Sequence, residues 1–271
     1  MKRSILILGA GLAATGAVAL MLGRTPEPAI TDLPELVEIP AGTYSYRLAG
    51  DFRAGTRVVD GPLEEREADA PLEIMKYPVS QADYARCVAD GACPSVGTTE
   101  RPEIPQTHVS FLDAVSYADW FSKQTGQQWR LPNDEEWVRA AGERFFDDAV
   151  GVNDTTGDPS ARWLREYSQN VIERGDADAE LRPFGAFGAN SNGVFDLAGN
   201  VWEWTDTCMI NAQMDESGGT ILDSSTYCGV RVAQGRHRAF IIEFVRDAKV
   251  GGCAVGLPPD YLGFRLVRES A

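Results

Sequence analysis

Histidine is almost absent from this chain, which has only His108 and His237 among 271 residues. Two imidazoles so far apart in sequence do not make the histidine-rich zinc or iron site of many metalloenzymes, so any such metal would need carboxylate ligands. Basic residues are also scarce, since 25 lysines and arginines stand against 40 acidic residues and leave a net charge of −15. This negative charge repels phosphate backbones and argues against nucleic-acid binding.

Several catalytic signatures are missing as well. The sequence has no Gly-x-Ser-x-Gly elbow, no Walker loop and no His-Glu-x-x-His motif, so hydrolase and kinase functions have no support. The stretch 5–14 imitates a dinucleotide-binding loop, but the second strand and acidic residue that such a fold needs do not follow it. With 27 glycines, 15 prolines and no long helical period, the composition favours a turn-rich fold.

The first residues are typical of an export segment. Two basic residues precede an apolar run over 5–22, which is 18 residues long, the lower limit for a membrane span. An uncleaved anchor and a removed signal peptide both fit this pattern, and either predicts a periplasmic protein, exported or anchored to the inner membrane. We therefore expect a signal peptide or anchor over 1–24, a proline-rich linker over 25–34 and one domain over 35–271.

The chain has five cysteines, which an exported protein can oxidise. Cys87 and Cys93 flank an expected helix end and turn, and Cys208 and Cys228 bracket an insertion rich in Gly, Ser and Asp. These positions predict two disulfides. Cys253 is then left over, either as a buried inert thiol or as a reactive one.

Capping patterns predict three helices. One begins after Ser80 and ends near residue 89, one has a Ser110–Asp113 capping box and ends at Gly126, and one covers 135–141. Strands are expected within 36–48 and at 72–76, 129–131, 201–205, 230–234 and 262–267. Residues 49–71 have the composition of a surface excursion. The stretch 143–200 shows little helical or strand periodicity. A long segment of this kind inside a compact domain is usually functional or is held in place by a bound group such as a metal.

Acidic residues mark the stretch 193–204, where Asp196 precedes a Gly-Asn turn and Glu203 stands between two tryptophans. Tryptophans that alternate in a strand normally pack in a core, which leaves Glu203 on the other face. Two carboxylates and the carbonyls of the turn make an oxygen cage of the kind that calcium prefers. A tight turn with solvated acids is the simpler alternative on the pattern alone.

A second polar group lies near the C-terminus, where 236–238 reads Arg-His-Arg and Glu243 and Arg246 follow. Such a mixture in an acidic protein predicts either a polar pocket or an exposed strand whose arginines pair with the surplus acids.

The order of these pieces resembles the formylglycine-generating enzyme (sulfatase-modifying factor) family over residues 36–267. The motifs that carry the resemblance are Val37–Thr43, Tyr77–Tyr84, Val109–Ala114, Trp129–Trp137, Asp196–Trp204 and Gly263–Arg265. The resemblance implies an α+β, C-type-lectin-like fold with little regular secondary structure. It also implies structural calcium.

By this resemblance, one calcium site falls on Asp196, the carbonyls of Gly199 and Val201, and Glu203. The other falls on Asn170, the carbonyl of Val171, Asp176 and Asp178. These ligand sets follow from the family and not from the spacing, because turn chemistry explains the acids around 170–178 equally well.

Family enzymes oxidise a substrate cysteine to formylglycine with copper(I) held by two cysteines, since soft thiolates suit that ion. Counting forward from the strand at 231–235 places these positions at Phe240 and Val245, and no cysteine occurs between Cys228 and Cys253. We therefore expect no copper at the family site and no formylglycine-generating activity.

Two functions then remain open. The first is an accessory or maturation protein that uses the old groove to bind a periplasmic protein or peptide partner. The second is a repurposed enzyme that modifies a peptide or small metabolite, with His237, Glu243, Arg246 and Cys253 as candidate catalytic residues. A weaker resemblance to a subgroup associated with copper nitrite reductases of denitrifying bacteria suggests a periplasmic redox maturation system as the partner.

Overall fold

The computed structural model describes residues 30–269 apart from 98, 148, 150–179 and 247–260. No helix within these residues is long and apolar enough to cross a membrane. The predicted export segment at 5–22 lies outside the described residues, as does most of the predicted linker. The three-part division of the chain stays a prediction.

Helices are few and strands are short, with the exception of one long hairpin. The helices are α1 (Gln81–Ala89), α2 (Phe111–Thr125) and α3 (Asp134–Ala141), with a 3-10 turn η1 (Gly142–Arg144) after α3. The strands are β1 (Leu36–Ile39), β2 (Gly42–Arg47), β3 (Gly50–Ala54), β4 (Arg57–Val59), β5 (Leu63–Ala68), β6 (Leu72–Met75), β7 (Trp129–Arg130), β8 (Trp202–Met214), β9 (Ile221–Gln234), β10 (Arg238–Ile242), β11 (Leu262–Gly263) and β12 (Val267–Arg268). The predicted α+β class is confirmed.

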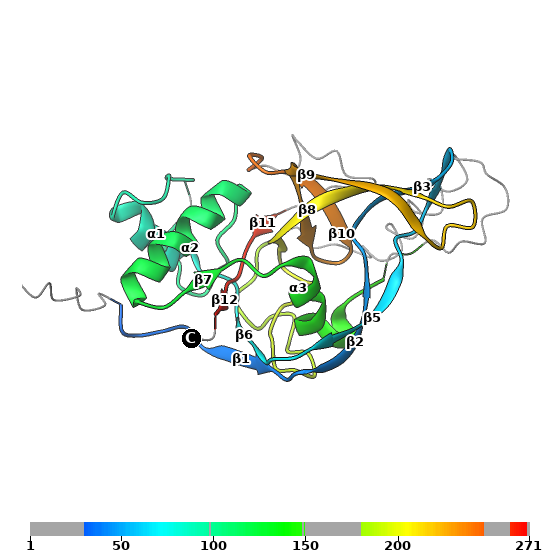
Figure 1. The fold of residues 1–271 in the computed structure, drawn as a ribbon. Coiled ribbons are helices and arrows are strands. Elements are labelled where there is room, and N and C mark those ends of the chain that lie inside the picture. Colours follow the sequence, from blue (N-terminus) through cyan, green and yellow to red (C-terminus); the bar gives the residue numbers. More distant parts are fainter. Residues whose placement is uncertain (1–29, 98, 148, 150–179, 247–260, 270–271) are drawn as a thin grey trace, which may run out of the picture.

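The strands of the described residues form three sheets. One has the order β1-β6-β12-β7, a second has the order β10-β9-β8-β3-β4 with β11 beside β8, and β2 pairs with β5 in a separate ribbon. Figure 1 shows α1 and α2 at one end of the molecule and the β8–β9 hairpin with β3 at the opposite end. Helix α3 lies between these ends and contacts both β8 and β9.

The helices begin and end where local sequence chemistry predicts. Ser110 and Asp113 form a reciprocal capping box at the start of α2, and Asn133 and Glu136 form one at the start of α3. Helix α2 ends at Gly126, whose φ of 68° is in the left-handed region that glycine adopts without strain. These caps satisfy backbone N–H groups at the helix starts and fix where each helix begins.

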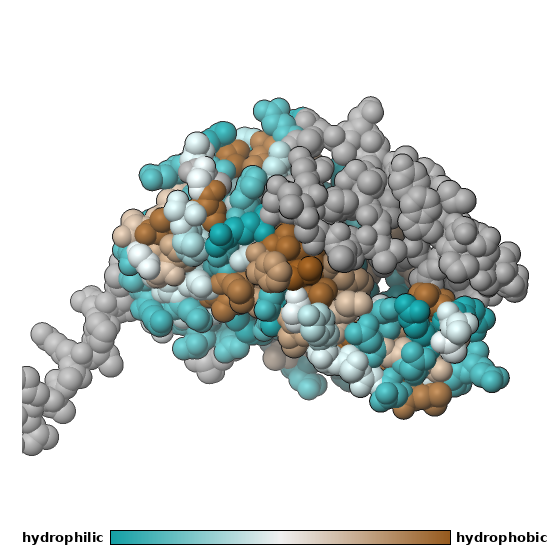
Figure 2. Space-filling model, turned by 90° about the horizontal axis from the view of Figure 1, so that it is seen from above, coloured by the Kyte–Doolittle hydropathy of each residue, from teal (hydrophilic) through white to brown (hydrophobic). Residues whose placement is uncertain are grey.

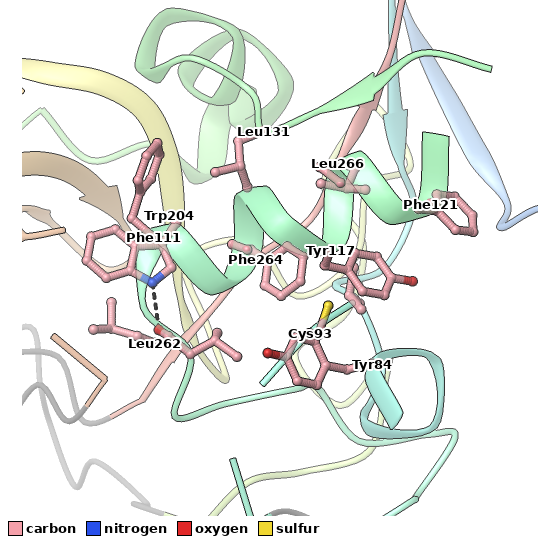
Figure 3. Packing of buried hydrophobic residues seen from close by; sticks show 14 of the residues in the cluster. Tyr84, Cys93, Phe111, Tyr117, Phe121, Leu131, Trp204, Leu262, Phe264 and Leu266 are labelled. Atoms are coloured by element: carbon pink, nitrogen blue, oxygen red, sulfur yellow. Dashed lines mark hydrogen bonds between the residues drawn. The ribbon is translucent and has the colours of Figure 1, made fainter. Parts of the chain in front are cut away.

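The largest core cluster joins α1 and α2 to the sheets. Aromatic side chains dominate it, and Figure 3 shows Phe111 of α2 beside Trp204 and Tyr117 beside Phe264, with Phe121 further along the helix. The indole of Trp204 is fully buried and donates to the carbonyl of Val109 at 2.9 Å. The expectation that this tryptophan packs in a core is confirmed.

Three sequence expectations were wrong in extent. The supposed surface excursion at 49–71 contains β3, β4 and β5, because Phe52 and Ala54 bury against Ala212 and Met214 of β8. The strands predicted at 201–205 and 230–234 are parts of the much longer β8 and β9, because the insertion between Cys208 and Cys228 forms most of their hairpin. The predicted strand at 262–267 is interrupted after Gly263, where the chain leaves the ladder.

Candidate functional site

Helix α3 rests on the β8–β9–β10 sheet through a buried polar layer. Its first residue, Asp134, is fully buried and accepts from the Tyr46 hydroxyl at 2.7 Å and from Arg238 at 3.0 Å. Gln234 of β9 donates to the other carboxylate oxygen of Asp134. Burial and the neighbouring Asp134 raise the pKa of Tyr46, so this phenol stays protonated and serves as a donor.

A second buried ion pair lies in the same layer. The carboxylate of Glu203 accepts from Nε and Nη2 of Arg265 at 2.6 Å each, and from the indole of Trp137 on α3 at 2.9 Å. Glu203 and Arg265 are both almost completely buried, with side-chain exposures of 1% and 0%. The layer therefore contains two buried acids and two buried arginines, which balance each other.

The predicted calcium ligand Asp196 also has protein partners. Its two carboxylate oxygens accept from the backbone N–H groups of Gly185 and Phe187 at 2.7 and 2.9 Å. Asp196 is fully buried and has a φ of 61°, so the tight turn was predicted correctly but its acids are not solvated. Gly199 is needed in this turn because a Cβ there would lie 2.6 Å from the Phe187 ring.

These contacts do not fit a calcium ion on the set Asp196, Gly199, Val201 and Glu203. Every carboxylate oxygen of Asp196 and Glu203 already accepts a hydrogen bond from a protein donor, and Arg265 neutralises the charge of Glu203. Within the described residues, no group of three or more His, Cys, Asp and Glu side chains is placed to hold a metal ion. The other predicted set, Asn170, Val171, Asp176 and Asp178, lies outside the described residues. Calcium binding stays a prediction.

The candidate catalytic residue His237 lies in the turn between β9 and β10. Its ring stands 4.4 Å from that of Trp202, and its Nδ1 is 2.9 Å from the carbonyl of Arg238. Gly235 permits this arrangement, because a Cβ there would lie 2.1 Å from the Trp202 ring. His237 is only 8% exposed, so its side chain is largely buried.

Glu243 and Arg246 lie together at the start of α2. The backbone of Glu243 accepts from the N–H of Phe111, and Arg246 binds the two oxygens of Asp113 at 2.6 and 2.8 Å. Burial would raise the pKa of Asp113, but the hydrogen bonds from Arg246 and Ser110 outweigh it and hold the pKa below its usual value. Arg246 therefore completes the helix cap.

The four candidate catalytic residues thus fall into two groups and a remainder. His237 contacts Trp202, Glu243 and Arg246 attach to α2, and Cys253 lies outside the described residues. Arg238 and Arg246 both pair with acids, as the strand interpretation predicted, although Arg238 and most of β10 are buried rather than exposed.

Both predicted disulfides are confirmed. Cys87 is bonded to Cys93 at 1.97 Å, and Cys208 to Cys228 at 2.02 Å. Four of the five cysteines are bonded in these two disulfides, and Cys253 lies outside the described residues. Of the two positions that correspond to the copper ligands, Phe240 lies in β10 and Val245 packs against the largest core cluster.

Sequence reasoning missed the polar layer itself. Asp134 and Arg265 both stand in motifs that carried the family resemblance, and that placement was the available signal. Their partners Arg238 and Glu203 were considered only as members of a pocket and of a metal site, because hydrogen bonds between distant segments leave no local pattern.

Comparisons with known proteins agree with this architecture. The sequence model of the family described as "Sulfatase-modifying factor enzyme 1-like domain" matches residues 23–270. The formylglycine-generating enzyme of Thermomonospora curvata is 33% identical over 135 residues, which is 48% of this chain and 42% of that protein. The mouse protein named "Inactive C-alpha-formylglycine-generating enzyme 2" is 30% identical over 228 residues, 78% of this chain and 63% of that protein. The chain thus spans less than two thirds of either relative.

A solved structure shows the same fold. The structure of PvdO from Pseudomonas aeruginosa has a TM-score of 0.57 at 22% identity, and the match covers 90% of this chain and all of PvdO. The match of the family model over nearly the whole chain and the shared fold confirm the predicted formylglycine-generating-enzyme-like, C-type-lectin-like architecture. This chain is therefore a member of the sulfatase-modifying-factor family.

Proposed function

We propose that this chain is an extracytoplasmic accessory or maturation protein that binds a partner and does not generate formylglycine. The observation that carries the proposal is the state of the cysteines, four of which form disulfides. A two-thiolate copper(I) site needs two free cysteines, and the two disulfides leave only Cys253 for such a site.

Three further observations support the proposal. One relative that aligns with 78% of the chain is itself named an inactive formylglycine-generating enzyme. Two disulfides and an export-like N-terminal pattern are typical of a protein from an oxidising compartment. The resemblance to the nitrite-reductase-associated subgroup makes a copper nitrite reductase or its maturation system the first partner to test.

The alternative of a repurposed enzyme has less support. Arg246 binds Asp113, the Glu243 carboxylate lies 3.9 Å from Nε of Arg231, and His237 is largely buried. A general base must reach a substrate proton, and an anion-binding arginine must have free donors. The contacts of these three side chains are therefore made within the fold.

The absence of formylglycine chemistry can be tested with the full chain, copper(I), oxygen and a cysteine-containing peptide substrate. We expect no peptide aldehyde by mass spectrometry, with the Thermomonospora curvata enzyme as positive control. The variant Cys253→Ser should behave identically. Aldehyde formation by the wild-type chain at a rate above the buffer control contradicts the proposal.

Partner binding can be tested by purifying the tagged full chain from the cell envelope of its host. We expect one protein to co-purify in stoichiometric amount, as shown by native mass spectrometry. A bound small molecule without a protein partner would overturn the accessory function and favour the enzyme.

A further inference from the structure

The first half of β9 has an edge that no described strand pairs. Strand β8 pairs with β9 along one side, but β10 covers the other side only from Val230 to Gln234. Every residue from Ile221 to Cys228 is exposed, and Leu222 and Tyr227 reach 68% and 58%. Figure 2 shows separate hydrophobic residues among hydrophilic ones at the right-hand end of the molecule, which carries the hairpin in Figure 1.

This segment is a strand although it contributes no residue to a core cluster. The small core beneath the hairpin is formed by residues of β3, β4 and β8. The segment is instead fixed at its two ends. The Cys208–Cys228 disulfide ties it to β8, and Asp215 closes the hairpin turn by accepting from the N–H groups of Gly219 and Thr220. The edge is therefore preorganised without being buried.

Three other edge strands in the described part of the chain, β4, β5 and β7, carry features that hinder pairing. Strand β5 has four charged residues among six, and β4 and β7 have only three and two residues. Charges and short length are the usual protection of sheet edges. From Ile221 to Gly229, by contrast, the only charged residue is Asp223, and there is no proline. An open edge of this kind is a template for another strand.

We propose that this edge binds an extended segment of a partner protein by β-strand addition. This inference rests on the proposed function and says where the partner binds. The ladder with β8 places Asp223, Ser225 and Tyr227 on one face of the sheet. A strand added here would set an apolar side chain opposite Tyr227 and a basic one opposite Asp223, four positions apart.

The partner segment is basic, and it is not a second copy of this chain. Net charge of −15 makes two copies repel each other and attracts a cationic segment. Self-pairing along this edge would also bring two copies of Asp223 into one interface without a basic residue to balance them.

The test uses the full chain and a labelled synthetic peptide of alternating Thr and Val, with one Lys and one Phe four positions apart on the same face. We expect saturable binding by fluorescence anisotropy and slowed hydrogen exchange of the amides within 221–229. Asp223→Lys and Tyr227→Ser should each weaken binding about fivefold or more. Their matched controls, Glu67→Lys and Leu63→Ser, change exposed residues of β5 and should leave binding unchanged.

The outcomes separate this inference from the proposed function. No binding, equal binding by all variants, protection elsewhere or dimerisation along the edge each overturns strand addition. If a native partner co-purifies equally with the wild type and with Asp223→Lys, the accessory function stands. The partner then binds elsewhere, and strand addition at this edge is wrong. Edge binding of the peptide without any native partner would contradict the accessory function while supporting the edge.

Discussion

Arg265 binds both carboxylate oxygens of Glu203 from a position 62 residues later in the chain. Its remaining donors reach the carbonyls of Met75, Lys76 and Phe195 at 3.0 to 3.2 Å. A guanidinium has five N–H donors, and here all five have acceptors. One fully buried side chain thus joins β6, the Asp196 turn and β8.

Removing this arginine should be strongly destabilising, because it leaves the Glu203 carboxylate buried without a counter-ion. We expect Arg265→Met to lower the free energy of unfolding by about 3–5 kcal/mol in urea denaturation. The matched control Arg268→Met breaks the partly exposed pair with Glu73 and should cost less than about 1 kcal/mol. Adding Glu203→Gln to Arg265→Met should recover part of the loss, and equal costs for the two single variants would refute the argument.

The same pair gives a prediction for calcium. Because Arg265 neutralises Glu203, the loss of stability in Glu203→Gln should be the same with added calcium and with chelator, measured as the midpoint of thermal unfolding. If chelator lowers the unfolding midpoint of the wild type and of Glu203→Gln but not that of Asp176→Asn, the ion belongs to the other predicted set. A chelator effect that Glu203→Gln abolishes would restore the calcium site at Glu203.

Thiol counting tests the disulfides. Unfolded, unreduced full chain should react with one equivalent of a thiol reagent, and Cys253→Ser should react with none, because the other four cysteines are bonded. The reduced wild type should react with five. Three or five reactive thiols before reduction would show that a disulfide is missing.

Acid stability should depend on Asp113. Its pKa is held below the usual 3.8, so the Arg246 contact stabilises the fold above that pH and loses its effect as pH falls through the folded-state value. We expect Arg246→Gln to lower the unfolding midpoint at pH 6 and to converge with the wild type as the pH falls below the folded-state pKa of Asp113. A constant difference between the two proteins across this range would exclude the carboxylate as the cause.

Local chemistry made part of this structure predictable. The caps at Ser110 and Asn133 act within four residues, and each helix begins where they place it. Both disulfides follow from cysteines that flank a turn or an insertion. The partners of Asp196 could not be predicted, because they are backbone N–H groups at 185 and 187, which any residue type offers. The length of the hairpin was missed because the first half of β9, Ile221–Cys228, buries no apolar residue that would mark it as a strand.

The polar layer beneath α3 also limits how this fold can vary. Asp134 is shared by Tyr46, Gln234 and Arg238, which come from three different strands. Replacing one of them alone leaves a buried charge or donor without a partner. Replacing all of them with apolar residues leaves no buried polar group unpaired. Substitutions at these four positions should therefore occur together among relatives, and a relative that lacks Asp134 should also lack Arg238.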